Sequence, residues 1–191
     1  MNEEIYNTAR ETFIRIVKGK AVVRGKVVLS FGKEADWYID MRRIITTEWD
    51  LGLAADLVVH QLHGLSFHAV GGMATGAVPI AIAVMTHPRM NCSSFWVNKE
   101  TKPHGTQNLV EGTIVPGHPV VVVEDVITTG SSTLKAIQVV RDMGCPVVAV
   151  VPLVDRLQGG RELLLDHGIL EDVYRPILTI DDLDLGGNER G

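Results

Sequence analysis

Residues 120–133, VVVVEDVITTGSST, constrain the fold of this chain more than any other stretch. Four consecutive valines without polar alternation indicate a strand buried on both faces, as in the middle of a parallel sheet. Because neighbouring ionised carboxylates resist burial, we expect this strand to end at Glu124 and Asp125 and to present both to water, a ligand or a cation. The next residues are mostly Thr, Gly and Ser, and LKAIQVVRDMG then has a helical period that ends at Gly144. The predicted order is strand, acidic tip, small polar loop and helix.

Strand-like and helical segments alternate through positions 50–160. Such alternation predicts βαβ units, and hence an α/β fold with a central, mostly parallel sheet flanked by helices. The hydrophobic period predicts helices at 2–19, 46–62 and 161–168. It predicts strands within 21–42 and at 93–97, 146–155 and 172–180. Residues 67–85 are expected to form a short strand, a glycine-rich turn and a helix. The apolar faces expected in the first two helices contain Ile5, Ala9, Phe13 and Val17, and Trp49, Leu53, Leu57 and Leu62. We expect residues 98–119 to form one long loop and the acidic tail 181–191 to be loose.

Composition limits the classes of protein to which the chain can belong. Its 191 residues are 46% hydrophobic and 21% charged, as in a single globular domain spanning 1–191. The formal net charge of −5 and the lack of a long basic run argue against a nucleic-acid or membrane partner. Cys92 and Cys145 lack CxxC spacing and the N-terminus has no leader pattern, so we expect a reduced, cytoplasmic setting.

Two glycine-containing turns have the chemistry of an anion site, at 70–79 (VGGMATGAVP) and 124–133 (EDVITTGSST). In each, small residues let backbone amides and a helix N-terminus approach a phosphate. Ligands of such sheets bind beyond the C-terminal strand ends, where both turns are expected. Neither turn matches GxxxxGK[ST] or GxGxxG, which argues against nucleotide hydrolysis and dinucleotide binding.

The stretch 120–133 resembles the phosphoribosyl-pyrophosphate signature of type I phosphoribosyltransferases, in which a hydrophobic strand, two acids and a T-x-G-[ST]-[ST] loop hold the ribose 5-phosphate. Four further segments are similar, in the same order, to segments of orotate phosphoribosyltransferases: 29–43 (LSFGKEADWYIDMRR), 70–81 (VGGMATGAVPIA), 98–112 (NKETKPHGTQNLVEG) and 154–160 (VDRLQGG). The resemblance covers about positions 25–165.

This resemblance implies a type I phosphoribosyltransferase fold with a core at about 45–165 and a hood at about 1–44, to which C-terminal residues can contribute. It implies an enzyme that makes orotidine 5′-monophosphate and pyrophosphate from orotate and phosphoribosyl pyrophosphate. The resemblance also implies that the enzyme uses Mg²⁺, held mainly by substrate and water, and that it forms a homodimer. Two alternatives stay open: a phosphoribosyltransferase for another base, and a non-catalytic sensor of phosphoribosyl pyrophosphate.

The acid pair and the loop that follows it are the first candidate site residues. Displacement of pyrophosphate builds positive charge on the ribose, so Asp125, as a catalytic residue, and Glu124 are expected to contact its hydroxyls. The residues expected to hold the 5-phosphate are Thr128, Thr129, Gly130, Ser131 and Ser132. The structural alternative is a plain strand-to-helix connection with a Ser or Thr cap.

The 98–112 segment carries candidate cations. In the family such a loop closes over the pyrophosphate of a neighbouring subunit, which implies diphosphate binding by Lys99 and catalytic roles for Lys102 and His104. A solvated basic loop is the alternative. Asn98 stands where the family commonly has arginine.

For the base, the resemblance implies contacts from Thr128 and from Arg156, whose guanidinium can pair with a planar carboxylate. The alternative for Arg156 is a surface ion pair with Asp155 or Glu162. Trp37 or Tyr38 of the hood can stack on the base. Other hood positions noted are Ser30, where many members of the family carry lysine, and Asp40 and Arg42, which are expected to brace the hood. His60 and His63 share a helix face without nearby metal-ligand spacing, so a packing or surface role is favoured over zinc.

Overall fold

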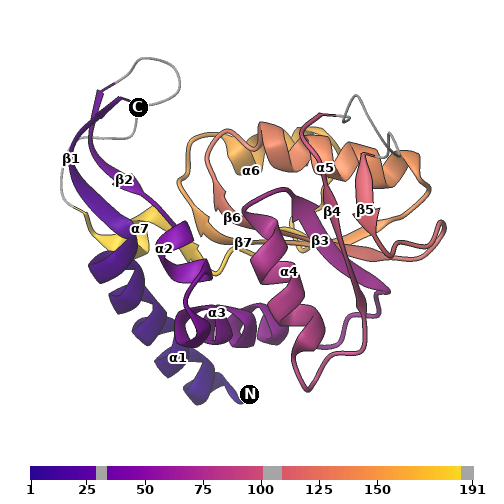
Figure 1. Cartoon of the computed structure of the whole chain (residues 1–191), viewed down its shortest axis with the longest axis horizontal. Coiled ribbons are helices and arrows are strands. Elements are labelled where there is room, and N and C mark those ends of the chain that lie inside the picture. The colour runs from indigo at the N-terminus through magenta and orange to yellow at the C-terminus, as the bar shows by residue number, and fades with distance from the viewer. Residues whose placement is uncertain (29–33, 101–108, 186–191) are drawn as a thin grey trace.

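The computed structural model describes residues 1–28, 34–100 and 109–185 of the chain (Figure 1). Its centre is a sheet with the strand order β5-β4-β3-β6-β7-β8. The strands are β3 Ala69–Met73, β4 Ser93–Val97, β5 Val110–Gly112, β6 Val120–Ile127, β7 Val147–Asp155 and β8 Leu178–Thr179. Neighbouring strands run parallel except β4 and β5, which confirms the predicted α/β class with a mostly parallel sheet.

Strand β6 lies in the middle of the sheet and is longer than predicted. Val120 to Val123 are fully buried, as the unbroken apolar run indicated. The prediction that the strand ends at the acid pair is wrong, because β6 continues to pair with β7 as far as Ile127 opposite Asp155. The acid pair therefore lies within the paired part of β6 and not beyond its end.

Helices cover both faces of the sheet (Figure 1). On one face lie α3 Glu48–Gln61 and α4 Ala77–Thr86, and on the other α5 Ser131–Asp142 and α6 Gly160–Asp166. The helices predicted at 46–62 and 161–168 are thus confirmed to within a turn at their ends. Each βα connection places the start of its helix at the C-terminal edge of the sheet, where ligands bind in this architecture.

The N-terminal segment forms a separate two-stranded antiparallel sheet beside the core (Figure 1). It comprises α1 Glu3–Ile16, a π-helical turn Val17–Ala21, β1 Val22–Val28, β2 Glu34–Ile39 and α2 Arg42–Ile45. The predicted buried faces are wrong at Ile5 and Trp49, which are 56% and 73% exposed. Tyr6, beside Ile5, is the buried side chain, because the stripe of α1 that faces α3 runs through Tyr6 and Phe13.

Two predictions for irregular or extended segments are also wrong. Strand β5 lies within the predicted loop 98–119, because the edge of β4 offers it backbone partners. Only Leu178–Thr179 of the predicted strand 172–180 pairs as a strand, with a single bridge at Tyr174. A short helix, α7 Ile180–Leu183, follows it.

The described part of the predicted loose tail is held in place. The Asp182 carboxylate accepts a hydrogen bond from the Thr179 amide at 2.7 Å, which caps α7. Arg10 of α1 binds the same carboxylate at 2.6 Å. Leu183 is fully buried. In the described ranges, none of the helices has the length and apolar character needed to cross a membrane.

Candidate active site

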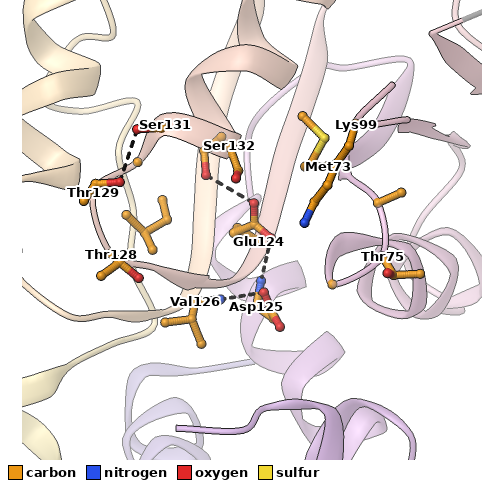
Figure 2. A pocket seen from close by; sticks show the side chains of 15 residues that line it. Met73, Thr75, Lys99, Glu124, Asp125, Val126, Thr128, Thr129, Ser131 and Ser132 are labelled. Atoms are coloured by element: carbon orange, nitrogen blue, oxygen red, sulfur yellow. Dashed lines mark hydrogen bonds between the residues drawn. The ribbon is translucent and has the colours of Figure 1, made fainter. Parts of the chain in front are cut away.

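A cavity of about 270 Å³ opens at the C-terminal ends of β3 and β6 (Figure 2). Three segments line it: the turn 73–76 before α4, Lys99 after β4, and the continuous stretch 124–133. The structure thus brings together all the described residues predicted to bind phosphoribosyl pyrophosphate: Lys99, Glu124, Asp125, Thr128, Thr129, Gly130, Ser131 and Ser132.

The loop between β6 and α5 is shaped to receive an anion. Gly130 has a φ of +77°, a left-handed conformation that favours glycine, and α5 begins at the next residue. A Cβ on Gly130 would also lie 2.9 Å from the Gly160 carbonyl oxygen, so the loop is packed against the start of α6. The Thr129 and Ser131 hydroxyls are 3.2 Å apart at the start of α5. Unpaired amides of a helix N-terminus and several hydroxyls suit a phosphate group.

The two acids have different environments. Glu124 is only 6% exposed and so is largely shielded from bulk water, but both acids line the cavity. Its Oε2 accepts a hydrogen bond from the Thr133 hydroxyl at 3.2 Å. Burial, followed by the nearby Asp125 charge, raises the pKa of Glu124 well above its ordinary value. A carboxyl group with a raised pKa binds its proton more tightly, and the protonated form is less costly to bury beside another acid.

Asp125 is the accessible acid of the pair. Its Oδ1 accepts a hydrogen bond from the Val126 amide at 2.9 Å (Figure 2). The turn before α4 approaches it closely, since a Cβ on Gly76 would lie 2.5 Å from Asp125 Oδ1. Glycine at this position therefore lets the second predicted anion turn pack directly against the carboxylate.

Among the lining residues that the structure describes, Lys99 is the only cation. Figure 2 shows its Nζ reaching toward Glu124. The Lys135 ammonium of α5 donates a hydrogen bond to the Lys99 carbonyl oxygen. Asn98 does not line the cavity; its side-chain amide is 3.4 Å from Glu111 of β5. The predicted catalytic residues Lys102 and His104 lie outside the described residues.

Arg156 lies at the end of β7 but is not part of the cavity wall. The predicted alternative of a surface ion pair is wrong, because Arg156 is 7% exposed and the Asp155 carboxylate binds the Tyr174 hydroxyl instead. The Arg156 amide donates to the Ile127 carbonyl at 2.9 Å, beside Thr128. Its guanidinium carbon is 5.1 Å from the ring centroid of Trp37.

The hood side chains divide into two groups. Trp37 is 5% exposed beneath the Arg156 guanidinium, whereas Tyr38 is half-buried. Arg42 binds Asp40 with 2.7 Å between Nε and Oδ1, which lowers the pKa of Asp40 and fixes the turn after β2. This contact matches the bracing role predicted for the pair.

Sequence reasoning missed three contributors to the site: Thr133, Lys135 and Tyr174. Thr133 lies within the 120–133 stretch and its hydroxyl is a natural partner for an acid, whereas the contacts of Lys135 and Tyr174 join segments far apart in the sequence. The histidine interpretation agrees with the structure, since His60 stacks on Tyr6 at 4.2 Å between ring centroids. In the parts of the chain that are described, no group of three or more His, Cys, Asp or Glu side chains could hold a metal ion.

Comparison with known proteins agrees with this geometry. Residues 53–166 match the phosphoribosyl transferase domain family. Orotate phosphoribosyltransferase of Mycobacterium leprae (strain TN) is 40% identical over 177 residues, covering 93% of this chain and 97% of that protein.

Solved structures are similar over the same extent. The crystal structure of Mycobacterium tuberculosis H37Rv orotate phosphoribosyltransferase with Fe(III) dicitrate has a TM-score of 0.83 at 39% identity, covering 93% of this chain and 99% of that one. The same enzyme in complex with 5-phospho-alpha-D-ribosyl 1-diphosphate gives 0.80 at 36% identity, with the same coverage. The predicted resemblance is confirmed, and the chain belongs to the orotate phosphoribosyltransferase family.

Proposed function

We propose that this chain transfers the phosphoribosyl group of 5-phospho-α-D-ribose 1-diphosphate to orotate, forming orotidine 5′-monophosphate and pyrophosphate for pyrimidine nucleotide synthesis. In this reaction the bond from ribose C1 to the diphosphate oxygen breaks, a bond from C1 to N1 of orotate forms, and N1 loses its proton. The observation that carries the proposal is one cavity in which an accessible acid, a hydroxyl-rich helix start and a lysine face one another.

Each wall of the cavity suits one part of the donor. Backbone amides at the start of α5 and the hydroxyls of the 128–132 loop bind the 5-phosphate. Asp125 faces the ribose, where its charge favours the positive charge that develops at C1 as the diphosphate leaves. Glu124 contacts the ribose hydroxyls less directly, because Thr133 and the protein interior enclose it.

The leaving diphosphate needs cations. Lys99 supplies one at the cavity wall. Lys102 and His104 follow it in the sequence, and we assign them to a lid that acts in the neighbouring subunit's site of a homodimer. Lys99 lines the cavity and begins this segment in the sequence, which supports the assignment.

Magnesium fits the donor set as a partner of the substrate. Mg²⁺ prefers oxygen ligands and usually keeps waters while bridging phosphates and one or two carboxylates. Asp125 is the accessible carboxylate in the cavity, and diphosphate and ribose oxygens would supply the other ligands. When bound, the ion neutralises charge on the diphosphate.

The base is assigned to Arg156 and Thr128. Thr128 lines the cavity, and the Arg156 amide binds the carbonyl of the residue before it, so the two lie on adjoining strand ends. A guanidinium pairs in bidentate fashion with a carboxylate, which orotate carries and uracil lacks.

We place the chain in the cytoplasm as a single domain, with its core at about 45–165 and a hood at about 1–44 that covers the base. The packing of α7 against α1 through Arg10 and Asp182 supports a C-terminal contribution to the hood. Cys92 and Cys145 are both free thiols, in keeping with a reducing compartment.

The test is to mix the protein with phosphoribosyl pyrophosphate, Mg²⁺ and orotate, and to follow orotate absorbance together with pyrophosphate release. We expect one pyrophosphate for each orotate consumed. Turnover with another base but not with orotate would identify a different phosphoribosyltransferase. Binding of phosphoribosyl pyrophosphate without turnover of any base would identify a sensor.

A further inference from the structure

The turn that carries Arg156 is fixed by a buried carboxylate. Asp155 is 1% exposed, and its Oδ2 accepts a hydrogen bond from the Tyr174 hydroxyl at 2.8 Å. Its Oδ1 accepts from the Leu157 amide, also at 2.8 Å. Leu157 has a φ of +52°, a conformation that a non-glycine residue adopts only when its surroundings hold it there. The Asp155 carboxylate therefore joins the backbone that follows Arg156 to the Tyr174 side chain.

Tyr174 links this carboxylate to another part of the sheet. It forms the isolated bridge with Val150 of β7 and is 6% exposed. Burial and the adjacent Asp155 raise the pKa of the Tyr174 hydroxyl, so it holds the proton of its hydrogen bond to Asp155 more tightly than an exposed tyrosine would. A buried carboxylate that lost this donor would be left partly unsatisfied.

The side chain of Arg156 is held from a different direction. Trp37, on β2 of the N-terminal sheet, places its ring centroid 5.1 Å from the guanidinium carbon. A ring at this distance attracts the flat face of a guanidinium and leaves the donors along its edge directed sideways. This contact joins the N-terminal sheet to the strand end that carries the arginine.

From these contacts we infer that Trp37, Asp155 and Tyr174 form an arginine clamp that positions the Arg156 guanidinium and thereby sets the preference for a base that carries a carboxylate. The inference rests on the proposed function, in which Arg156 contacts the base. The three are positioning residues: they act through Arg156. With the clamp intact, the guanidinium is already oriented before orotate arrives, and little side-chain freedom is lost on binding.

The clamp predicts a selective defect. Loosening it weakens recognition of orotate, whereas the 128–132 loop, which belongs to a separate helix start, keeps its hold on phosphoribosyl pyrophosphate. It also predicts that the ratio of kcat/KM for orotate to that for uracil falls, since uracil offers no carboxylate for the arginine to select.

Tyr174→Phe tests the carboxylate side of the clamp, with Tyr6→Phe as its matched control. Both tyrosines are buried and both hydroxyls bind a side chain, but the partner of Tyr6 is Gln61, at 2.7 Å, on the α1–α3 interface. We expect Tyr174→Phe to raise KM for orotate about tenfold, the effect of losing a hydrogen bond to a charged group, with KM for phosphoribosyl pyrophosphate changed by less than about twofold. Tyr6→Phe should change neither.

Trp37→Leu tests the other side, with the exposed Trp49→Leu as its control. We expect about a fivefold to tenfold rise in KM for orotate, and Trp37→Phe should restore most of the affinity because a phenyl ring still offers a face to the guanidinium. Melting temperatures identify any variant that fails to fold. If Trp37→Leu does so, the comparison of wild type with Trp37→Phe, Tyr174→Phe and Tyr6→Phe decides.

The clamp is overturned if the Tyr174 and Trp37 variants alter KM for orotate no more than their controls do, or alter KM for both substrates by equal factors. Failure of the proposed function looks different, because the wild-type protein would then not convert orotate at all.

Discussion

The phosphate loop 128–132 and the arginine clamp lie at the same edge of the sheet but are built in different ways. The loop is one continuous piece of chain, and the polar groups that it offers to the cavity are mostly backbone amides and short hydroxyls. The clamp draws on separate segments, with side chains from β2, β7 and the chain before β8. We therefore expect substrate binding at the loop, the phosphate end of the site, to depend on backbone conformation. Binding at the clamp, the base end, should depend on individual side chains. The two should fail independently of each other.

A second contrast lies within the acid pair. Both acids line the cavity, but Glu124 is buried and accepts a hydrogen bond from Thr133, whereas Asp125 is the more accessible of the two. Asp125 is thus expected to affect turnover, and Glu124 is expected to affect the pH dependence of stability.

The largest expected effect is that of Asp125→Asn. We expect kcat to fall on the order of 10²-fold or more while the fold is retained, because the carboxylate stabilises charge that develops in the transition state. Steady-state kinetics and circular dichroism measure the two quantities. Asp142→Asn, at the exposed end of α5, is the control for loss of an acid. An unchanged kcat would remove Asp125 from the ribose site.

Complementation between two inactive variants tests whether the lid is shared. If Lys102 acts in the partner's site, mixing Lys102→Ala with Asp125→Asn gives hybrid dimers with one intact site. At random exchange half the dimers are hybrids with one working site of two, so about a quarter of wild-type activity should return. Subunit exchange must be shown separately, for example by mixing differently labelled chains. Exchange without recovery would mean that the lid serves its own chain or that the lysine is dispensable.

Gly130→Ala should weaken binding of phosphoribosyl pyrophosphate and leave binding of orotate nearly unchanged. The alanine would have to adopt a φ of +77° with its Cβ 2.9 Å from the Gly160 carbonyl oxygen. Backbone strain of this kind costs about 1–3 kcal/mol, so we expect KM for phosphoribosyl pyrophosphate to rise about tenfold with KM for orotate little changed. Gly117→Ala is the matched control, since Gly117 has a φ of +81° but open space around it. Equal changes in both substrates would contradict the separation of the two ends.

The smallest expected effect is on the pH dependence of stability. A carboxyl group with a raised folded-state pKa, as for Glu124, binds its proton more tightly in the folded chain. Its favourable contribution is complete below the unfolded pKa and is lost as pH rises through the folded pKa. Glu124→Gln cannot ionise, so its melting temperature relative to wild type should climb as pH rises above about 5, by about 2–4 °C for each 1 kcal/mol relieved.

Melting curves of Glu124→Gln and wild type across this pH range measure the difference. Glu162→Gln, which removes an exposed carboxylate of α6, controls for the change in net charge. A difference that does not vary with pH would show that the Glu124 proton is not bound more tightly in the folded state.

Local sequence information was enough to predict the order of elements around residues 120–144. The buried strand, the acids, the loop and the helix lie within one stretch, and their order follows from valine burial, glycine conformation and helical period. The alternation of elements through 50–160 likewise predicted the parallel sheet, because periodicity reports which face of each element is buried.

Features that depend on distant partners could not be predicted from the sequence. Burial of Glu124 depends on the helix that follows and on continued pairing with β7. The position of Trp37 under Arg156 depends on how the N-terminal sheet docks. Strand β5 and helix α7 are too short to give a period, and the exposure of Trp49 depends on which elements pack against α3. Such errors concern contacts between segments, and the clamp is built from contacts of that kind.

The most direct test of this account is kcat/KM for orotate, uracil, hypoxanthine and xanthine, measured for wild type and for Arg156→Ala, with Arg15→Ala on the exposed side of α1 as control. We predict that wild type prefers orotate and that Arg156→Ala lowers kcat/KM for orotate by roughly 30-fold or more, because it removes a charged hydrogen-bond partner in a closed site. Affinity for phosphoribosyl pyrophosphate should stay within about twofold of wild type. A wild-type preference for a base without a carboxylate, or an equal loss of both substrates in Arg156→Ala, would contradict the assignment of orotate and the separation of the two ends.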